Sequence, residues 1–187
     1  FAPDVLGGLA GALAHGIIHL GWGIDAESPW MITEGLAYLN FAHLGVDASA
    51  LIEDAKNESD PWDSFLRVTE TAEEQNLSQT WVETVKQKYD ESFHSELVPA
   101  GFQWQFAKVL KEPDKVATEL PTWLSDLSIE EAFEKLYHAV TLVYLATRDK
   151  DGNGNFVVLH AITSLWALEK TCNAIGVEST TRSALRQ

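Results

Sequence analysis

The sequence is short of positive charge and of cysteine. Its 187 residues include 13 Lys and Arg against 28 Asp and Glu, which gives a net charge of −15. A surface this negative repels phosphate backbones and anionic lipid headgroups, so we expect no nucleic-acid partner. The single cysteine, Cys172, cannot form an internal disulfide, which fits a reducing compartment. We therefore expect a cytoplasmic protein.

Several enzyme motifs are also missing. The chain has no G-x-G-x-x-G, no P-loop and no G-x-S-x-G, so no nucleotide cradle or serine nucleophile can be assigned. Residues 5–24 carry no formal charge over the length of a bilayer span, but six glycines and two histidines favour a buried helix over a membrane span. Because the chain begins at Phe1 and not at Met, we expect a processed protein, a fragment or a partial gene model.

The pattern that is present is helical nearly throughout. Residues 4–22 predict a first helix, and Ser28-Pro29 and Asp60-Pro61 are typical helix starts. Further helices are predicted over residues 78–89 and 102–110, after the capping box at Ser128, and over residues 156–175. We find no strand pair with a turn signal. The sequence thus predicts an all-α bundle of roughly seven helices, with residues 1–187 forming one domain.

Two histidines four residues apart are the sharpest local feature. His15 and His19 project from one face of the predicted first helix, a spacing that can present two imidazoles to one metal ion. Gly16 stands where a zinc protease of the H-E-x-x-H type has glutamate, which excludes that mechanism. The alternative is a pair of core histidines bonded to carbonyls, but the nearby glycines would let another helix or a ligand approach closely.

Three further residues complete the candidate site. His138 and His160 lie in apolar runs of the last two predicted helices, and the run around His138 is apolar on all sides, which predicts a central helix. Buried imidazoles need partners, so we expect His160 to approach His15 and His19, with His138 as a fourth member. Glu34 is a candidate carboxylate ligand, or else a solvated residue.

The loop over residues 149–155 resembles an EF-hand calcium loop. Oxygen-bearing residues occupy its first, third and fifth positions and glycine its sixth, but position twelve is His160 instead of glutamate. We interpret the loop as an interhelical turn without tight calcium binding, in which Asn155 caps the last helix and the two helices lie antiparallel.

Taken together, the sequence resembles the questin oxidase-like family. The resemblance depends on residues 14–23 (AHGIIHLGWG), 34–37 (EGLA) and 156–164 (FVVLHAITS). It covers most of residues 3–175 and corresponds to the C-terminal half of the family, whose members carry further histidine-containing sequence. It implies oxidation of aromatic polyketides by ring-opening or Baeyer–Villiger-like chemistry, consumption of NADPH, and in some members a non-haem iron held mainly by histidine. Metal or catalytic roles are thereby implied for His15, His19 and His160.

Two functions follow as hypotheses. The first is an oxidoreductase in which a histidine-bound redox metal activates oxygen against a small aromatic or phenolic substrate. The second is a non-catalytic helical subunit of a larger assembly, which the negative charge and the seven tryptophans favour. The opening Phe1-Ala2-Pro3 resembles processed plastid proteins of algae, so this alternative implies a plastid.

Overall fold

The described residues form seven α-helices and one pair of short strands. The computed structural model describes residues 6, 8–44, 51–77, 79 and 118–186. The all-α prediction is confirmed. The helices are α1 (His15–Asp25), α2 (Pro29–Phe41), α3 (Pro61–Glu74), α7 (Trp123–Asp126), α8 (Ile129–Ala146), α9 (Phe156–Ile175) and α10 (Glu178–Leu185).

Four helices begin where the sequence predicts a cap. The Ser28 hydroxyl accepts the backbone N–H of Met31, and an Asp60 carboxylate oxygen accepts that of Trp62. Ser128 and Glu131 form both halves of the capping box at the start of α8. Asn155 caps α9, which holds His160, and Gly176 ends that helix with a left-handed φ of 66°. These caps satisfy backbone groups that would otherwise lack partners.

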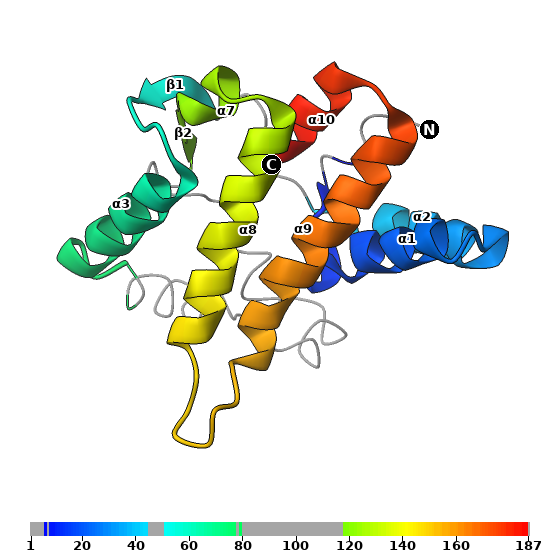
Figure 1. Ribbon diagram of the computed structural model, residues 1–187, viewed down its shortest axis with the longest axis horizontal. Helices are drawn as coiled ribbons and strands as arrows, with labels where there is room; N and C mark the ends of the chain where they lie inside the picture. The colour runs from blue at the N-terminus through cyan, green and yellow to red at the C-terminus, as the bar shows by residue number, and fades with distance from the viewer. Residues whose placement is uncertain (1–5, 7, 45–50, 78, 80–117, 187) are drawn as a thin grey trace, which may run out of the picture.

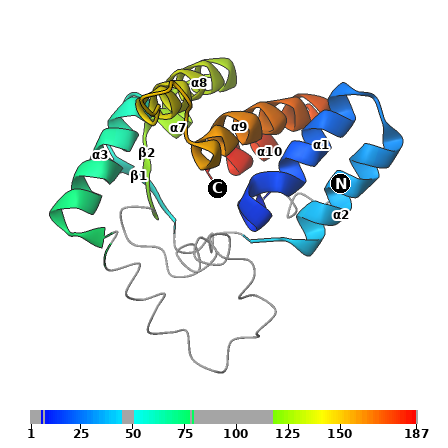
Figure 2. The ribbon, with the colours of Figure 1, turned by 90° about the horizontal axis from the view of Figure 1, so that it is seen from below.

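The long helices lie in one row (Figures 1 and 2). Helices α8 and α9 run antiparallel, joined at one end by residues 147–155, as predicted (Figure 1). Helix α3 packs on α8, whereas α1 packs on α9 and α2 covers the far side of α1 (Figure 2). The order across the row is therefore α3, α8, α9, α1, α2, which brings the start of the chain against a helix near its end.

Glycines allow the closest helix contacts. A Cβ on Gly35 would lie 2.5 Å from the backbone nitrogen of Leu20, so α2 meets α1 backbone to backbone. A Cβ on Gly21 would lie 2.6 Å from the Cβ of Ala167, so α9 comes equally near to α1. Gly16, one of the glycines from which a close approach was predicted, shows it as well, since a Cβ there would lie 2.8 Å from the backbone nitrogen of Leu39 on α2. The main apolar core fills the space between the helices, with Ile17, Leu20, Leu39, Phe133, Val140 and Leu168 among its buried members.

Three local predictions were wrong. The first helix begins at His15 and not at residue 4, because a turn at Gly11–Ala14 (η2) contains three residues of left-handed conformation. The structure has a parallel strand pair, β1 (Ile52–Lys56) with β2 (Glu119–Pro121), which is too short to give an alternating pattern. Helix α10 was not predicted. The helix predicted over residues 78–89 lies outside the described residues except for Gln79, and the helix predicted over residues 102–110 lies outside them entirely.

Candidate functional site

His15 and His160 meet across the contact between α1 and α9. His15 is the first residue of α1 and His160 lies one turn into α9, and both side chains are half-buried. Their Nε2 atoms are 3.4 Å apart and their ring centroids 4.9 Å apart in an edge arrangement. Residues separated by 145 positions are thus brought together, as the sequence analysis expected for a shared centre.

Backbone carbonyls orient both imidazole rings. His15 Nδ1 is 2.6 Å from the carbonyl oxygen of Ala12, and His160 Nδ1 is 3.0 Å from that of Phe156. A carbonyl oxygen can only accept, so each Nδ1 donates its proton, and a ring in the Nδ1–H tautomer presents a lone pair at Nε2. Two lone pairs therefore point into the same small space. A metal ion, or a proton or hydroxyl donor placed between them, would be stabilised there.

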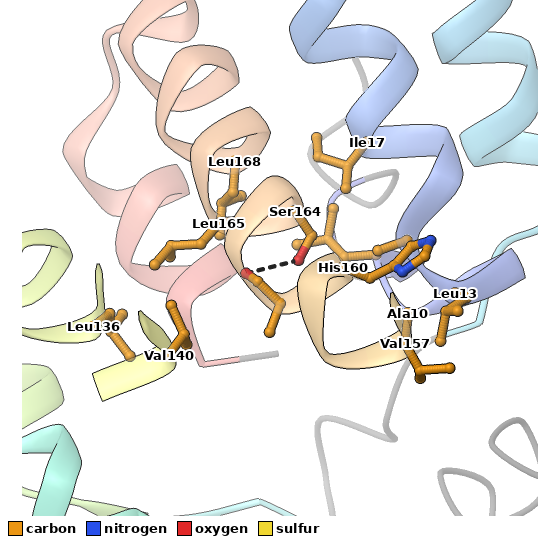
Figure 3. A pocket seen from close by; sticks show the side chains of 13 residues that line it. Ala10, Leu13, Ile17, Leu136, Val140, Val157, His160, Ser164, Leu165 and Leu168 are labelled. Atoms are coloured by element: carbon orange, nitrogen blue, oxygen red, sulfur yellow. Dashed lines mark hydrogen bonds between the residues drawn. The ribbon is translucent and has the colours of Figure 1, made fainter. Parts of the chain in front are cut away.

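A cavity of about 430 Å³ adjoins this pair between the start of α1, α8 and α9. Figure 3 shows the ring of His160 on the side of the cavity formed by Ala10 and Leu13. Ser164 is the other polar residue of the described lining, and its hydroxyl donates to the carbonyl of Ala161 at 3.3 Å. The remaining described lining residues are apolar: Leu9, Ala10, Leu13, Ala14, Ile17, Leu136, Val140, Val157, Ala161, Leu165 and Leu168. Such a cavity suits an apolar or aromatic ligand with few polar groups.

His19 lies one turn along α1 from His15 and contacts α2, and Glu34 lies on α2 itself. The His19 ring packs against the rings of Trp22 and Tyr38, with centroids 5.6 and 5.7 Å away. Glu34 is exposed on α2, where a carboxylate keeps its hydration. The structure therefore does not add the carboxylate of Glu34 to the pair of imidazoles, and it shows His19 engaged with aromatic neighbours.

His138 is placed apart from the other histidines. It is exposed on α8 and lines a second cavity of about 330 Å³, beside Asp60, Trp62, Asp63 and Lys135. Helix α8 lies between α3 and α9, but the expectation that it is buried on all sides was wrong, because Phe133 and Val140 are buried whereas Leu142 and Leu145 are exposed. The apolar run around His138 therefore did not imply burial.

The comparisons with known proteins decide the family. The model of the family described as questin oxidase-like matches residues 1–187, the whole chain. The chain belongs to the questin oxidase-like family. This membership indicates an oxidoreductase-type function in general. No curated protein gives a significant match, and neither does any solved structure.

The metal that the questin oxidase-like resemblance implied can be tested against the donor atoms. Two nitrogen ligands at about 2.0–2.1 Å from one tetrahedral metal ion lie roughly 3.3 Å from each other, which matches the 3.4 Å between the Nε2 atoms. Within residues 6–44, 51–79 and 118–186, as far as they are described, no three His, Cys, Asp or Glu side chains come together to hold a metal ion. The pair thus fits two coordination positions, and the described residues supply no third.

One feature of this questin oxidase-like site had no signal in the sequence. Ala12, Leu13 and Ala14 have φ values of 49°, 56° and 61°, and they precede His15 directly. Non-glycine residues seldom adopt this left-handed conformation, so nothing in an Ala-Leu-Ala sequence predicts it. The sequence therefore indicated that the first helix continues through these residues. The carbonyl that orients His15 belongs to this turn, and it could be located only from the structure.

The search for membrane-spanning segments gave none. No described helix combines the length and the apolar character that crossing a bilayer requires. The uncharged stretch at residues 5–24 contains α1, which packs against α2 and α9.

Proposed function

We propose that this protein is an oxidoreductase that acts on a small aromatic or phenolic substrate, with His15 and His160 as ligands of a metal ion. The observation that carries the proposal is the convergence of two Nε2 lone pairs, 3.4 Å apart, beside an apolar cavity. Family membership supports the oxidoreductase class. A redox metal such as non-haem iron, when bound, would supply the electron transfer needed to activate oxygen.

The chain's own residues provide binding and orientation. The carbonyls of Ala12 and Phe156 hold both imidazoles in the tautomer that a metal requires, as carbonyls commonly do for metal-bound histidines. The apolar walls would hold a planar aromatic ring and exclude water from reactive species. The hydroxyl of Ser164 is the lining group that could turn from the Ala161 carbonyl to a phenolic oxygen of the substrate.

The NADPH implied by the resemblance receives no site here. The described residues that line the cavity include no Arg or Lys to bind its phosphates. We assign His15 and His160 to the metal alone. We do not carry His19, His138 or Glu34 into the site.

Metal binding tests the proposal directly. The purified protein is titrated with Co²⁺ under argon, and binding is followed by calorimetry and by the visible absorption of bound Co²⁺. We expect one bound ion, affinity lowered at least 100-fold by His15→Ala or His160→Ala, and no change with the matched control His138→Ala. Absence of binding by the unsubstituted protein, or equal loss with His138→Ala, would contradict the metal site.

The cavity is tested with a phenolic probe. Binding of 2-naphthol is measured by fluorescence in the protein and in Ala161→Trp, whose indole would fill the cavity from α9. We expect binding to be lost in the variant, with metal affinity retained. If Ala161→Trp and the unsubstituted protein bind the probe equally, the substrate does not use this cavity.

The accessory-subunit alternative keeps one observation in its favour. Trp30 and Phe41 on α2 are 86% and 90% exposed, which is unusual for large apolar side chains. If neither Co²⁺ nor 2-naphthol binds the intact protein, this alternative becomes the better account.

A further inference from the structure

We infer that residues 12–14, called here the left-handed turn, position His15 and aim its Nε2 lone pair at His160. The inference rests on the proposed function, in which the Nε2 lone pair of His15 binds a metal ion. It concerns positioning, because the turn acts on the proposed metal through the ring of His15, although Leu13 and Ala14 also line the cavity.

The turn is strained in a specific way. Ala12, Leu13 and Ala14 have φ,ψ of 49°,38°, 56°,45° and 61°,12°, so three consecutive side chains occupy the left-handed region. Each such residue other than glycine costs roughly 1–2 kcal/mol, and runs of them are rare. None of the three is glycine, although Gly8 and Gly11 lie close by in the sequence. Strain of this kind persists where the surrounding structure imposes it.

The end of α2 holds the turn in place from one side. A Cβ on Gly11 would lie 1.5 Å from the carbonyl oxygen of Ala42, and a Cβ on Gly8 would lie 2.2 Å from the His43 ring. Leu9 and Leu44 form an isolated parallel bridge in the same place. The chain before α1 therefore packs closely against the residues that follow α2, and α1 begins directly after this contact, at His15.

The conformation sets where one carbonyl points. In a regular helix the carbonyl of residue 12 would accept the N–H of residue 16. Here the Ala12 oxygen accepts the backbone N–H of His15 and lies 2.6 Å from Nδ1 of the same residue. Two contacts to one acceptor fix both the start of α1 and the rotation of the imidazole. The lone pair at Nε2 is thereby directed to His160 before any ligand arrives.

Substitutions at Ala14 separate positioning from packing. Ala14→Gly permits a positive φ without penalty, whereas Ala14→Val opposes it through a branched Cβ. Ala14 lines the cavity, which has space for the two added methyl groups. Ala161→Val is the matched control, because it adds the same atoms to the same cavity from an ordinary position of α9.

The readout is the tautomer of His15 in the metal-free protein, from long-range ¹H–¹⁵N correlation spectra. We expect the Nδ1–H tautomer in the unsubstituted protein, in Ala14→Gly and in Ala161→Val, and its loss in Ala14→Val. We also expect Ala14→Gly to raise Tm by about 2–4 °C through relief of strain. An unchanged tautomer in folded Ala14→Val, or a lowered Tm in Ala14→Gly, overturns the inference. Should Ala14→Val not fold, the Tm of Ala14→Gly decides.

Failure of the proposed function has a different signature. If no variant binds Co²⁺ but the tautomers follow the expected order, the turn positions His15 and the metal proposal fails. If Co²⁺ binds equally to folded Ala14→Val and to the unsubstituted protein, the metal site stands and the positioning role is refuted.

Discussion

Two helix contacts each place a histidine beside a cavity, and they differ in almost every other respect. At the contact between α1 and α9, His15 and His160 are half-buried, bonded to backbone carbonyls and next to an apolar cavity. At the contact between α3 and α8, His138 is exposed and its cavity contains Asp60, Asp63 and Lys135. An apolar run in the sequence surrounds His138 as well as His160. The packing of neighbouring helices therefore decides which histidine is withdrawn from water.

The largest predicted effect comes from forcing α1 and α9 apart. Gly21→Val would place side-chain atoms where Ala167 lies, since even a Cβ would be 2.6 Å from the Cβ of that residue. We expect the free energy of unfolding in urea to fall by about 3 kcal/mol, as for a severe overpacking. The contact between α3 and α8 should remain, so a loss of Co²⁺ affinity in the folded variant would follow from separating the imidazoles.

A matched glycine variant controls for the loss of glycine itself. Gly176→Ala, at the end of α9, has no atom within 4 Å of the new Cβ but has a φ of 66°. We expect it to cost about 1 kcal/mol, from the left-handed conformation alone, and to leave Co²⁺ binding intact. If both variants cost the same, close packing at Gly21 does not hold the two helices together.

The same contrast shows what the sequence could predict. Caps such as Ser28, Asp60, Ser128 and Asn155 bond to backbone N–H groups two or three residues further along the chain, so local sequence predicts where their helices begin. The left-handed turn is imposed by contacts with the end of α2, some 30 residues along the chain, and Ala and Leu carry no local signal for it. The approach of His160 to His15 was expected from spacing and glycines, whereas the exposure of His138 depends on which face of α8 its neighbours cover.

Tyr137→Phe tests the link between the two regions. The Tyr137 hydroxyl on α8 donates to a carboxylate oxygen of Glu169 on α9 at 2.7 Å, and burial raises the pKa of Tyr137, with the Glu169 hydrogen bond adding to the shift. Because the hydroxyl is only partly buried, its loss should lower the free energy of unfolding by about 1.5 kcal/mol. Chemical denaturation at pH 7 measures this, and Tyr144→Phe on the same helix is the control. A smaller loss in Tyr137→Phe than in the control would show that the hydrogen bond does not join the helices.

The contact between α3 and α8 should lose stability at low pH through Asp60. A hydrogen bond from Lys135 and a second from the backbone of Trp62 hold the pKa of Asp60 below its ordinary 3.8. The folded-state pKa is therefore depressed, so the stabilisation is present above about pH 4 and is lost as pH falls further. We expect Asp60→Ala to cost about 1 kcal/mol at pH 7, mainly as a lost cap, and less at pH 3.

Two variants sharpen this measurement. Asp60→Asn keeps an oxygen for the Trp62 N–H but cannot ionise, so its stability relative to the unsubstituted protein should rise as pH falls from 5 to 3. The side chain of Asn155, which caps α9, does not titrate, so Asn155→Ala should cost about 1 kcal/mol equally at both pH values. A pH-dependent cost in Asn155→Ala would mean that the acid response is not specific to Asp60.

The smallest predicted effect is that of calcium on the loop that joins the two regions. The Asp149 carboxylate already accepts the backbone N–H groups of Asp151 and Asn153 at 2.8 and 2.9 Å, and these bonds lower its pKa. The residue at the closing position, His160, is bonded to Phe156 and faces His15. A calcium ion would have to break the hydrogen bonds of the turn and would gain no bidentate carboxylate ligand.

With a dissociation constant above 1 mM, 1 mM Ca²⁺ adds less than about 0.4 kcal/mol of stability, so Tm should change by no more than about 1–2 °C. A shift of several degrees at micromolar Ca²⁺ would contradict this and would make the loop a cation site directly beneath α9.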